Sequence, residues 1–181
     1  MPEADKGHAV ILVAIGANLP GPWGEQPVDT CRRAATELDR LPGLRVAAVS
    51  RWYRSAPVPR SDQPDYANGV VHLSGSADPA DLLARLHGIE AAAGRVRGAP
   101  NAARTLDLDI IDIDGLVRDA PDPRLPHPRA HERAFVLLPV QDVAPGWIEP
   151  RSGCRVAVLL AKLREGCGAA SAQVGWPTPY R

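Results

Sequence analysis

Four aspartates crowd the segment RTLDLDIIDID, residues 104–114, whereas residues 94–103 before it carry arginines but no acid. The aspartates are Asp107, Asp109, Asp112 and Asp114, and the arginines that precede them are Arg95, Arg97 and Arg104. The whole chain has a formal net charge of zero, so this separation of charge is local. Guanidinium groups bind phosphate oxygens and carboxylates bind hard divalent cations, so the segment predicts a site for phosphates and a metal.

The alternation of residue types from residue 105 to residue 113 predicts a β-strand. Successive side chains of a strand point to opposite faces, so Asp107 and Asp109 would share one face. The apolar residues on the other face, Leu106, Leu108 and Ile110, would point into a core. The two aspartate Cα atoms would lie roughly 7 Å apart, so their carboxylates could share one cation or bridge two. The D-x-D spacing alone fits a solvated strand face equally well.

Asp112 and Asp114 fall on the opposite parity, near the end of the predicted strand. Asp114 and Gly115 form a dipeptide that favours a tight hairpin turn, with a short return strand near Leu116 and Val117. We therefore interpret Asp112 and Asp114 as strand-end and turn residues rather than as metal ligands.

The segment between Arg95 and Arg104 has the composition of a mobile loop, with glycine, proline, asparagine and alanine and little apolar mass. A basic loop beside two carboxylates is suited to close over a polyphosphate whose charge is partly neutralised by metal. Each arginine taken singly fits an exposed basic loop equally well. Only the position of the arginines beside the aspartate pair favours a catalytic lid.

The elements that must position this site alternate along the chain. Strands are predicted at residues 8–15, 44–54, 67–74 and 105–113, long helices at 23–40 and 79–93, and shorter helices at 130–138 and 155–164. The order βαββαβ is typical of an α+β ferredoxin-like sandwich, in which helices cover one face of an antiparallel sheet. We expect a single domain over residues 1–181, with a core at about 10–165 and loosely held termini, including the tail after Gly166.

The helix predicted at residues 79–93 carries one unusual residue on its apolar side. Asp78 is a good N-cap, and Pro79 is a good first helical residue. At about 100° per residue, Glu90 falls inside the arc of buried leucines, where a carboxylate needs a partner or a ligand. Structural hydrogen bonding and contact with a nucleotide both fit that position. His87 lies at the edge of the same arc.

The segment RTLDLDII resembles the signature of the 6-hydroxymethyl-7,8-dihydropterin pyrophosphokinases of folate biosynthesis. Five further segments resemble motifs of that family in the same order: AIGANLP (14–20), SRWYRSAPV (50–58), QPDYANGVV (63–71), IEAAAGRVR (89–97) and LPHPRAHERAFVLLPVQDVAP (125–145). Six motifs in order, over roughly residues 10–150, make the resemblance specific and extend it over most of the chain.

The resemblance implies transfer of a pyrophosphoryl group from ATP to the hydroxymethyl group of a reduced pterin, with release of AMP and participation of two magnesium ions. It places Asp107 and Asp109 on the metal-binding aspartates of the family. It places Arg95, Arg97 and Arg104 on the arginines of a mobile catalytic loop, with Arg95 and Arg104 acting in catalysis. ATP is thus the expected co-substrate and Mg²⁺ the expected cofactor.

The resemblance also divides the remaining site residues between two ligands. The residues expected at the nucleotide are His87, Glu90, Arg97, Arg104, Ile110, His127 and Arg133. The residues expected at the pterin are Ser55, Ala56, Val58, Tyr66, Asn68 and Phe135. The rings of Tyr66 and Phe135 would lie on the two faces of the pterin. Without the resemblance, Phe135 would be assigned to the core of an apolar stretch, and Tyr66 to the recognition of some flat ligand.

Composition limits the other functions open to the chain. It has 181 residues, 45% of them hydrophobic, which suits one domain with a sizeable core. Zero net charge argues against nonspecific nucleic-acid binding, the three cysteines show no C-x-x-C spacing, and no apolar run has the length of a membrane span. We expect a cytoplasmic monomer that acts on small molecules, with no nucleic-acid or membrane partner.

Two functions from other classes fit parts of the pattern. A ferredoxin-like RNA-binding module would share the fold, but the aromatic residues expected on its sheet are lacking. A metal-dependent nuclease or nucleotidyltransferase would use the same D-x-D spacing, and the six motifs in order disfavour it. An ordinary P-loop kinase is excluded because the chain has no G-x-x-x-x-G-K-S/T segment.

Overall fold

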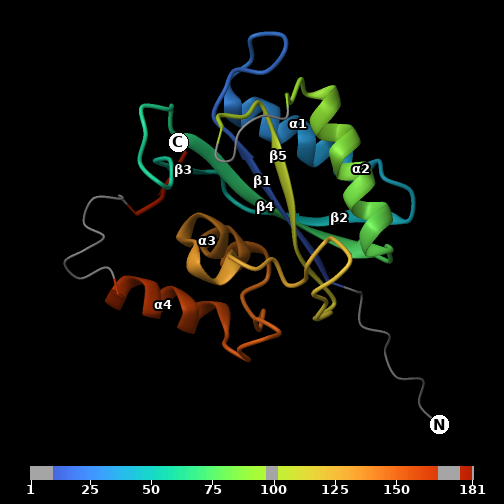
Figure 1. Cartoon of the computed structure of the whole chain (residues 1–181), viewed down its shortest axis with the longest axis vertical. Coiled ribbons are helices and arrows are strands. Elements are labelled where there is room, and N and C mark those ends of the chain that lie inside the picture. The colour runs from blue at the N-terminus through green and yellow to red at the C-terminus, as the bar shows by residue number, and fades with distance from the viewer. Residues whose placement is uncertain (1–9, 97–101, 167–175, 181) are drawn as a thin grey trace.

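The computed structural model describes residues 10–96, 102–166 and 176–180 of the chain. In that part of the chain, six strands form one antiparallel sheet with helices packed around it (Figure 1). The elements in chain order are β1 (Ile11–Ala17), α1 (Pro27–Asp39), β2 (Leu44–Val49), β3 (Tyr53–Ser55), β4 (Tyr66–Gly75), α2 (Pro79–Ala92), β5 (Asp107–Ile113), η1 (Ala130–Glu132), α3 (Ala134–Val143), α4 (Val156–Gly166) and β6 (Thr178–Pro179). The strands β5, β1, β4, β3 and β6 lie side by side in that order, and β2 also pairs with β4.

The helices α1 and α2 pack on one face of the sheet because each carries apolar residues at helical spacing. In α1 the buried residues Cys31, Ala34 and Leu38 form this stripe. The helix α2 begins as the sequence predicts, with Asp78 as an N-cap that accepts two backbone hydrogen bonds. The residues predicted to face a core, Leu106, Leu108 and Ile110, all belong to the core under these two helices.

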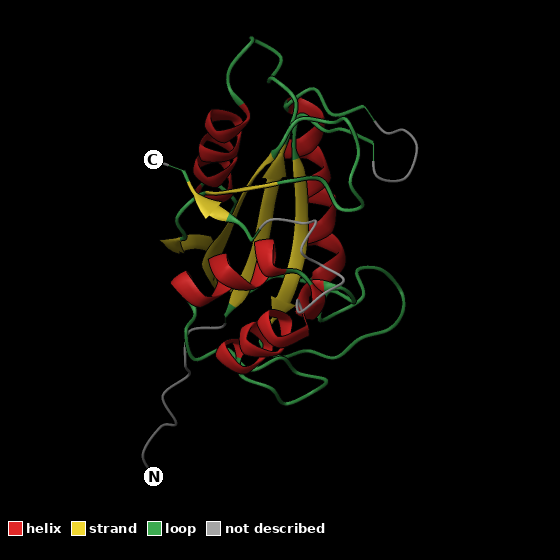
Figure 2. Cartoon of the chain, turned by 90° about the vertical axis from the view of Figure 1, so that its left-hand side faces the viewer, coloured by secondary structure: helices red, strands yellow, loops and turns green. Residues whose placement is uncertain are grey.

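The helices α3 and α4 pack on the opposite face, so helices cover both faces of the sheet rather than the one face expected. Figure 2 shows the strands enclosed between helices. This second core joins Leu12, Val70 and Ile111 of the sheet to Val136 and Leu160 of the helices. The strand β1 is buried along both faces instead of alternating, which is the pattern of a strand covered on both sides.

The strand predicted at residues 44–54 is in fact two strands, β2 and β3, which both pair with β4. Ser50 lies between them. Its hydroxyl accepts a hydrogen bond from Val70 N at 2.9 Å and donates to Arg51 O at 2.7 Å. Residues 50–52 therefore separate the two strands, while the Ser50 side chain satisfies a backbone donor of β4.

The strand β5 contains a bulge that alternation of residue types does not reveal. Its register with β1 shifts by one residue, because Val13 pairs with Ile110 whereas Leu12 pairs with Asp112. The extra residue, Ile111, changes the faces of the residues that follow it. Asp112 consequently lies on the side of the sheet that α3 and α4 cover.

Asp112 and Asp114 are strand-end and turn residues, as interpreted from the sequence. Asp112 accepts hydrogen bonds from Trp147 Nε1 at 2.9 Å and Gly115 N at 3.1 Å. Asp114 has a left-handed backbone, with φ at 54°, and accepts a hydrogen bond from Val10 N at 3.0 Å. The prediction that Asp112 points to the opposite face of the sheet is wrong, however, because the bulge places it on the same face as Asp107 and Asp109.

Two further expectations are corrected. The return strand predicted near residues 116–117 does not form, and Arg118 and Leu125 make an isolated bridge after the turn instead. The tail after Gly166, predicted to be loosely held, has a described part at residues 176–180 that includes β6 and pairs with β3. Within the ranges that the structure describes, no helix is both long and apolar enough to cross a bilayer.

Candidate active site

A cavity of about 350 Å³ opens beside β1, β4 and β5, on the face of the sheet that α3 covers. Its lining contains two chemically different groups of residues. The predicted pterin residues in the lining are Ser55, Ala56, Val58, Tyr66, Asn68 and Phe135. The arginines, aspartates and histidine in the lining are Arg104, Asp107, Asp109, His127 and Arg133. The combination of apolar walls with a few convergent polar groups is typical of a small-molecule site.

The six predicted pterin residues form one side of the cavity, which we call the uncharged wall. Part of it is built where β3 pairs with β4. Ser55 pairs with Tyr66, and Tyr53 pairs with Asn68. Asn68 is buried, and its Nδ2 donates a hydrogen bond to Ser55 Oγ at 2.9 Å. Tyr66 and Phe135 are only half-buried and both line the cavity. Phe135 therefore borders the α3/α4 core without being enclosed in it.

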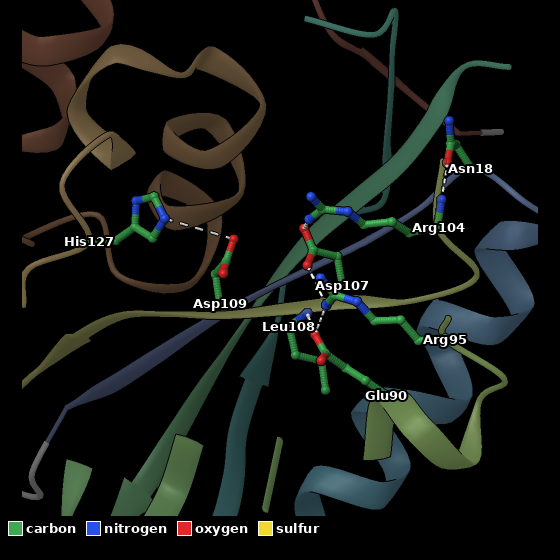
Figure 3. A network of polar contacts seen from close by, with 8 residues as sticks. All are labelled: Asn18, Glu90, Arg95, Arg104, Asp107, Leu108, Asp109 and His127. Atoms are coloured by element: carbon green, nitrogen blue, oxygen red, sulfur yellow. Dashed lines mark hydrogen bonds and ion pairs between the residues drawn. The ribbon is translucent and has the colours of Figure 1, made fainter. Parts of the chain in front are cut away.

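Four charged side chains, Glu90, Arg95, Arg104 and Asp107, form a continuous network (Figure 3). Arg95 Nη1 donates hydrogen bonds to Glu90 Oε1 and, at 2.7 Å, to Asp107 Oδ1. Arg104 Nη1 donates to the other carboxylate oxygen of Asp107 at 2.5 Å. Asp107 thus binds one arginine from each end of the segment predicted to form a lid.

Glu90 is the most buried member of the network, with 2% of its surface exposed. Its Oε1 accepts a hydrogen bond from Leu108 N at 2.8 Å, on the outer edge of β5. Burial raises the pKa of Glu90, while the Leu108 hydrogen bond and the charge of Arg95 lower it. The Glu90 carboxylate therefore makes structural hydrogen bonds that join α2 to β5, and the contact with ATP expected from the resemblance stays a prediction.

Asp109 and His127 form a second pair in the cavity (Figure 3). His127 Nε2 lies 3.8 Å from Asp109 Oδ2, and His127 Nδ1 accepts a hydrogen bond from Arg129 N at 3.1 Å. Burial, reinforced by the positive charge of Arg133, lowers the pKa of His127 to about 4. The imidazole is therefore neutral at pH 7, and because Nδ1 accepts, Nε2 carries the hydrogen and can donate it.

The two aspartates that share a face have the chemistry of a magnesium site. Burial and the negative charge of Asp107 raise the pKa of Asp109 to about 6, so the ionised pair is held together against repulsion. Carboxylate oxygens are ligands that Mg²⁺ prefers, and a cation would relieve this repulsion. Among the described residues, no group of three or more acidic, histidine or cysteine side chains is placed to hold a metal ion. The pair therefore fits an ion that phosphates and water would also coordinate.

Some predicted site residues do not reach the cavity. The Ile110 side chain lies in the α1/α2 core, 4% exposed, on the face opposite the two aspartates. Any contact between Ile110 and ATP would have to come from its backbone. His87, Glu90 and Arg95 lie outside the lining, although Arg95 bonds to a residue that is part of it. Arg97 falls outside the described residues.

Asn18 is a site residue that the sequence pattern did not reveal. Its side chain is buried, and Nδ2 donates hydrogen bonds to Gln63 Oε1 at 3.1 Å and Pro64 O at 3.2 Å. Its Oδ1 accepts a hydrogen bond from Arg104 N at 2.8 Å (Figure 3). Asn18 therefore joins the loop before Tyr66 to Arg104. An asparagine after a strand is an ordinary turn residue, so its type and position carry no signal of this role.

The fold and the cavity together define a class of protein. A wall with two aromatic rings shares one cavity with paired carboxylates, arginines and a neutral histidine. The first group suits a flat ring, and the second suits a polyphosphate with its metal. Such a site belongs to a transferase that moves a phosphate-containing group between a nucleotide and a small flat acceptor.

Within that class, the chain belongs to the 7,8-dihydro-6-hydroxymethylpterin-pyrophosphokinase (HPPK) family, whose sequence model matches residues 12–145. It is similar to the 2-amino-4-hydroxy-6-hydroxymethyldihydropteridine pyrophosphokinase of Pseudomonas aeruginosa, with 41% identity over 135 residues, which cover 75% of this chain and 80% of the relative. The protein of the same name from Synechocystis sp. is 38% identical over 152 residues, 84% of this chain and 75% of that relative. The resemblance found in the motifs is confirmed.

Solved structures share the fold. A Plasmodium falciparum HPPK-DHPS variant crystallised with pterin and p-hydroxybenzoate has a TM-score of 0.67 at 10% identity, over 93% of this chain and 46% of that chain. The wild-type protein crystallised with pteroate has the same score at 11% identity, over 94% of this chain and 45% of that chain. This chain spans less than half of those chains, and the likeness confirms the α+β ferredoxin-like fold alone.

Proposed function

We propose that this enzyme transfers a diphosphate group from ATP to 6-hydroxymethyl-7,8-dihydropterin, giving AMP and the pterin diphosphate for folate biosynthesis. Family membership supports the reaction. The structural observation that carries the proposal is that the rings of Tyr66 and Phe135 line the same cavity as the carboxylates of Asp107 and Asp109. A flat acceptor and a polyphosphate can thus be held together in one site, which the transfer requires.

The uncharged wall would bind the pterin. The rings of Tyr66 and Phe135 supply apolar faces against which a flat heteroaromatic ring gains contact area. Asn68 is fixed by its hydrogen bond to Ser55, so its amide is preorganised to read the polar edge of the ring. The acceptor is then oriented before it meets the nucleotide.

The charged residues would bind the triphosphate. Arg104 and Arg133 line the cavity and present guanidinium groups, which bind phosphate oxygens bidentately. Neutral His127 would donate from Nε2 without adding charge. Arg95 already bonds to Asp107, so its guanidinium would lie near a phosphate that Asp107 held through a metal ion.

Asp107 and Asp109 would hold the magnesium, and we propose two ions. When bound, magnesium withdraws negative charge from the phosphate oxygens and orients them. In the reaction, the hydroxymethyl oxygen forms a bond to the β-phosphorus, and the bond from that phosphorus to the oxygen bridging the α-phosphate breaks. AMP leaves with that oxygen, and the hydroxyl proton passes to solvent. The arginines would stabilise the negative charge that develops along the transferring group.

Identification of the nucleotide product tests this proposal. The protein is incubated with ATP, magnesium and the reduced pterin, and the nucleotides are separated by chromatography. AMP should form in a one-to-one ratio with the pterin diphosphate, because attack at the β-phosphorus moves two phosphates as a unit. ADP as the main product would mean attack at the γ-phosphorus and would contradict a pyrophosphokinase.

Removal of either ring should weaken pterin binding. Phe135→Ala and Tyr66→Ala are each expected to lose about 1 to 3 kcal/mol of pterin binding free energy, the usual contribution of an aromatic stacking partner. ATP binding should change much less, because the phosphate-binding residues are untouched. Isothermal titration calorimetry of each ligand separately measures both effects.

The matched control is Trp23→Ala, which removes an exposed ring outside the cavity lining. Its ring stacks on Arg33, with 4.5 Å between the guanidinium carbon and the ring centroid. This variant should bind both ligands as the unmodified protein does. Equal loss of pterin and ATP binding in Phe135→Ala, with lower thermal stability, would instead show that Phe135 is a core residue.

A further inference from the structure

The last described residues of the chain return to the sheet beside the uncharged wall. Residues 176–180, which we name the C-terminal hook, contain β6 and pair antiparallel with β3 (Figure 1). Pro179 pairs with Tyr53, and Thr178 pairs with Arg54. Tyr180 N also donates a hydrogen bond at 2.8 Å to the carbonyl of the residue before β3. The hook therefore takes the outer position next to β3.

Aromatic residues hold both ends of the hook. The Trp176 ring packs against the α3/α4 core, and the guanidinium carbon of Arg164 lies 5.1 Å from its centroid. The Tyr180 ring packs against the α1/α2 core, and the guanidinium carbon of Arg54 lies 5.0 Å from its centroid. Pro177, between the two rings, is buried. The hook thus contacts both cores and crosses the edge of the sheet between them.

The strand that the hook covers is short and carries part of the pterin wall. β3 spans only Tyr53–Ser55, and it has β4 on one side and β6 on the other. Ser55 accepts the hydrogen bond that fixes Asn68, and the cavity wall continues directly into Ala56 and Val58. A three-residue edge strand paired on one side alone would be held weakly. The pairing with β6 therefore fixes the start of this wall.

The phosphate-binding residues are far from the hook in the sheet order. β5, which carries Asp107 and Asp109, lies at the opposite edge from β6. Arg104 is held by Asn18, at the end of β1, and Asp107 is held by Arg95 after α2. None of these contacts involves β3 or β6. Loss of the hook should consequently loosen the pterin wall and leave the nucleotide side in place.

We propose that the C-terminal hook is a positioning element for the pterin side of the cavity, acting through β3 on Ser55 and Asn68. This inference rests on the proposed function, because it assigns the wall beside β3 to the pterin. The hook touches no substrate. It sets the affinity for the pterin by holding the wall in its binding conformation, and it does not contribute to ATP binding or to the chemical step.

A truncated variant that lacks residues 176–181 tests the proposal. Its dissociation constant for the pterin, titrated without ATP, is expected to rise about tenfold. A tenfold change corresponds to the net free energy of one or two hydrogen bonds. Its dissociation constant for ATP with magnesium, titrated without pterin, should be nearly unchanged. In steady-state assays of AMP formation, KM for the pterin should rise while kcat at saturating pterin is retained.

Rescue separates positioning from a general loss of stability. A synthetic peptide of the sequence WPTPYR, added at millimolar concentration, should restore pterin affinity to the truncated variant, and a scrambled peptide should not. If the truncated variant does not fold, the double variant Trp176→Ala/Tyr180→Ala, which keeps the β6 backbone, is measured by the same two titrations. It should also lose pterin affinity selectively.

Two results would overturn the role of the hook. One is a folded truncated variant that binds the pterin as tightly as the full-length chain does. The other is an equal loss of pterin and ATP affinity in the folded truncated or double variant. Failure of the proposed function looks different, because the full-length protein itself would then show no pterin binding or no AMP formation.

Discussion

Replacement of Asp107 or Asp109 by asparagine is expected to lower turnover at least about a thousandfold, roughly 4 kcal/mol of transition-state stabilisation. Each change removes an anionic oxygen from a pair that would share the metal, and an amide is a poor substitute for a carboxylate toward Mg²⁺. At position 107 it also removes the charge that pairs with Arg95 and Arg104. The rate of AMP formation at saturating substrates measures the effect, and circular dichroism checks the fold.

Asp114→Asn is the matched control for these variants. It makes the same isosteric change a few residues further along, where a left-handed backbone with φ at 54° accepts asparagine readily. Turnover should stay close to that of the unmodified protein. If Asp114→Asn lowered turnover as strongly as Asp107→Asn, with both variants folded, the assignment of Asp107 and Asp109 as the metal pair would be wrong.

Arg95→Ala is expected to slow the chemical step by about three to five orders of magnitude, the range seen when an arginine that stabilises a phosphoryl-transfer transition state is removed. In the described structure Arg95 bonds to Glu90 and Asp107 and lies outside the cavity lining. It should therefore contribute little to the binding of either substrate alone. Single-turnover kinetics should show the slow step, and titrations should show nearly unchanged dissociation constants for ATP and the pterin.

Two further variants serve as comparisons for Arg95→Ala. Arg95→Lys should recover only part of the rate, because an ammonium group lacks the planar, bidentate geometry of guanidinium. Arg85→Ala removes an exposed arginine of α2 that donates a hydrogen bond to Pro42 O, away from the cavity lining, and it should leave the rate unchanged. A loss of ATP affinity in proportion to the loss of rate in Arg95→Ala would make Arg95 a residue of the ground-state complex instead.

The parts of the site that follow from local chemistry are predictable from the sequence. Alternation of residue types correctly places Leu106 and Leu108 in a core, which leaves Asp107 and Asp109 together on the other face. Glu90 stands out because a carboxylate on an apolar helix face needs a partner, and the structure supplies one. These predictions hold because each depends on the period of a single helix or strand.

The parts that depend on contacts between distant segments were not predictable in the same way. The bulge in β5 arises from its register with β1, and the Ser50 hydroxyl bonds to β4 in the gap between β2 and β3. Asn18 acquires its role only when the loop before Tyr66 and the end of the lid segment meet. The C-terminal hook depends on the rings of Trp176 and Tyr180, which pack against different cores. No local pattern of residue types predicts these contacts between distant segments.

The ion pairs around the cavity also affect the long-range electrostatic attraction between the protein and a nucleotide that is still in solution. Among the described residues of the cavity lining and the network beside it, with the carboxylates ionised, three groups are negative (Glu90, Asp107 and Asp109) and three are positive (Arg95, Arg104 and Arg133). These six charges sum to zero, and salt screens what remains of their field within about 8 Å. They should therefore add little long-range attraction for ATP, whose phosphates would gain affinity by replacing the carboxylates that already pair with the arginines. The rate of encounter should accordingly be nearly independent of salt.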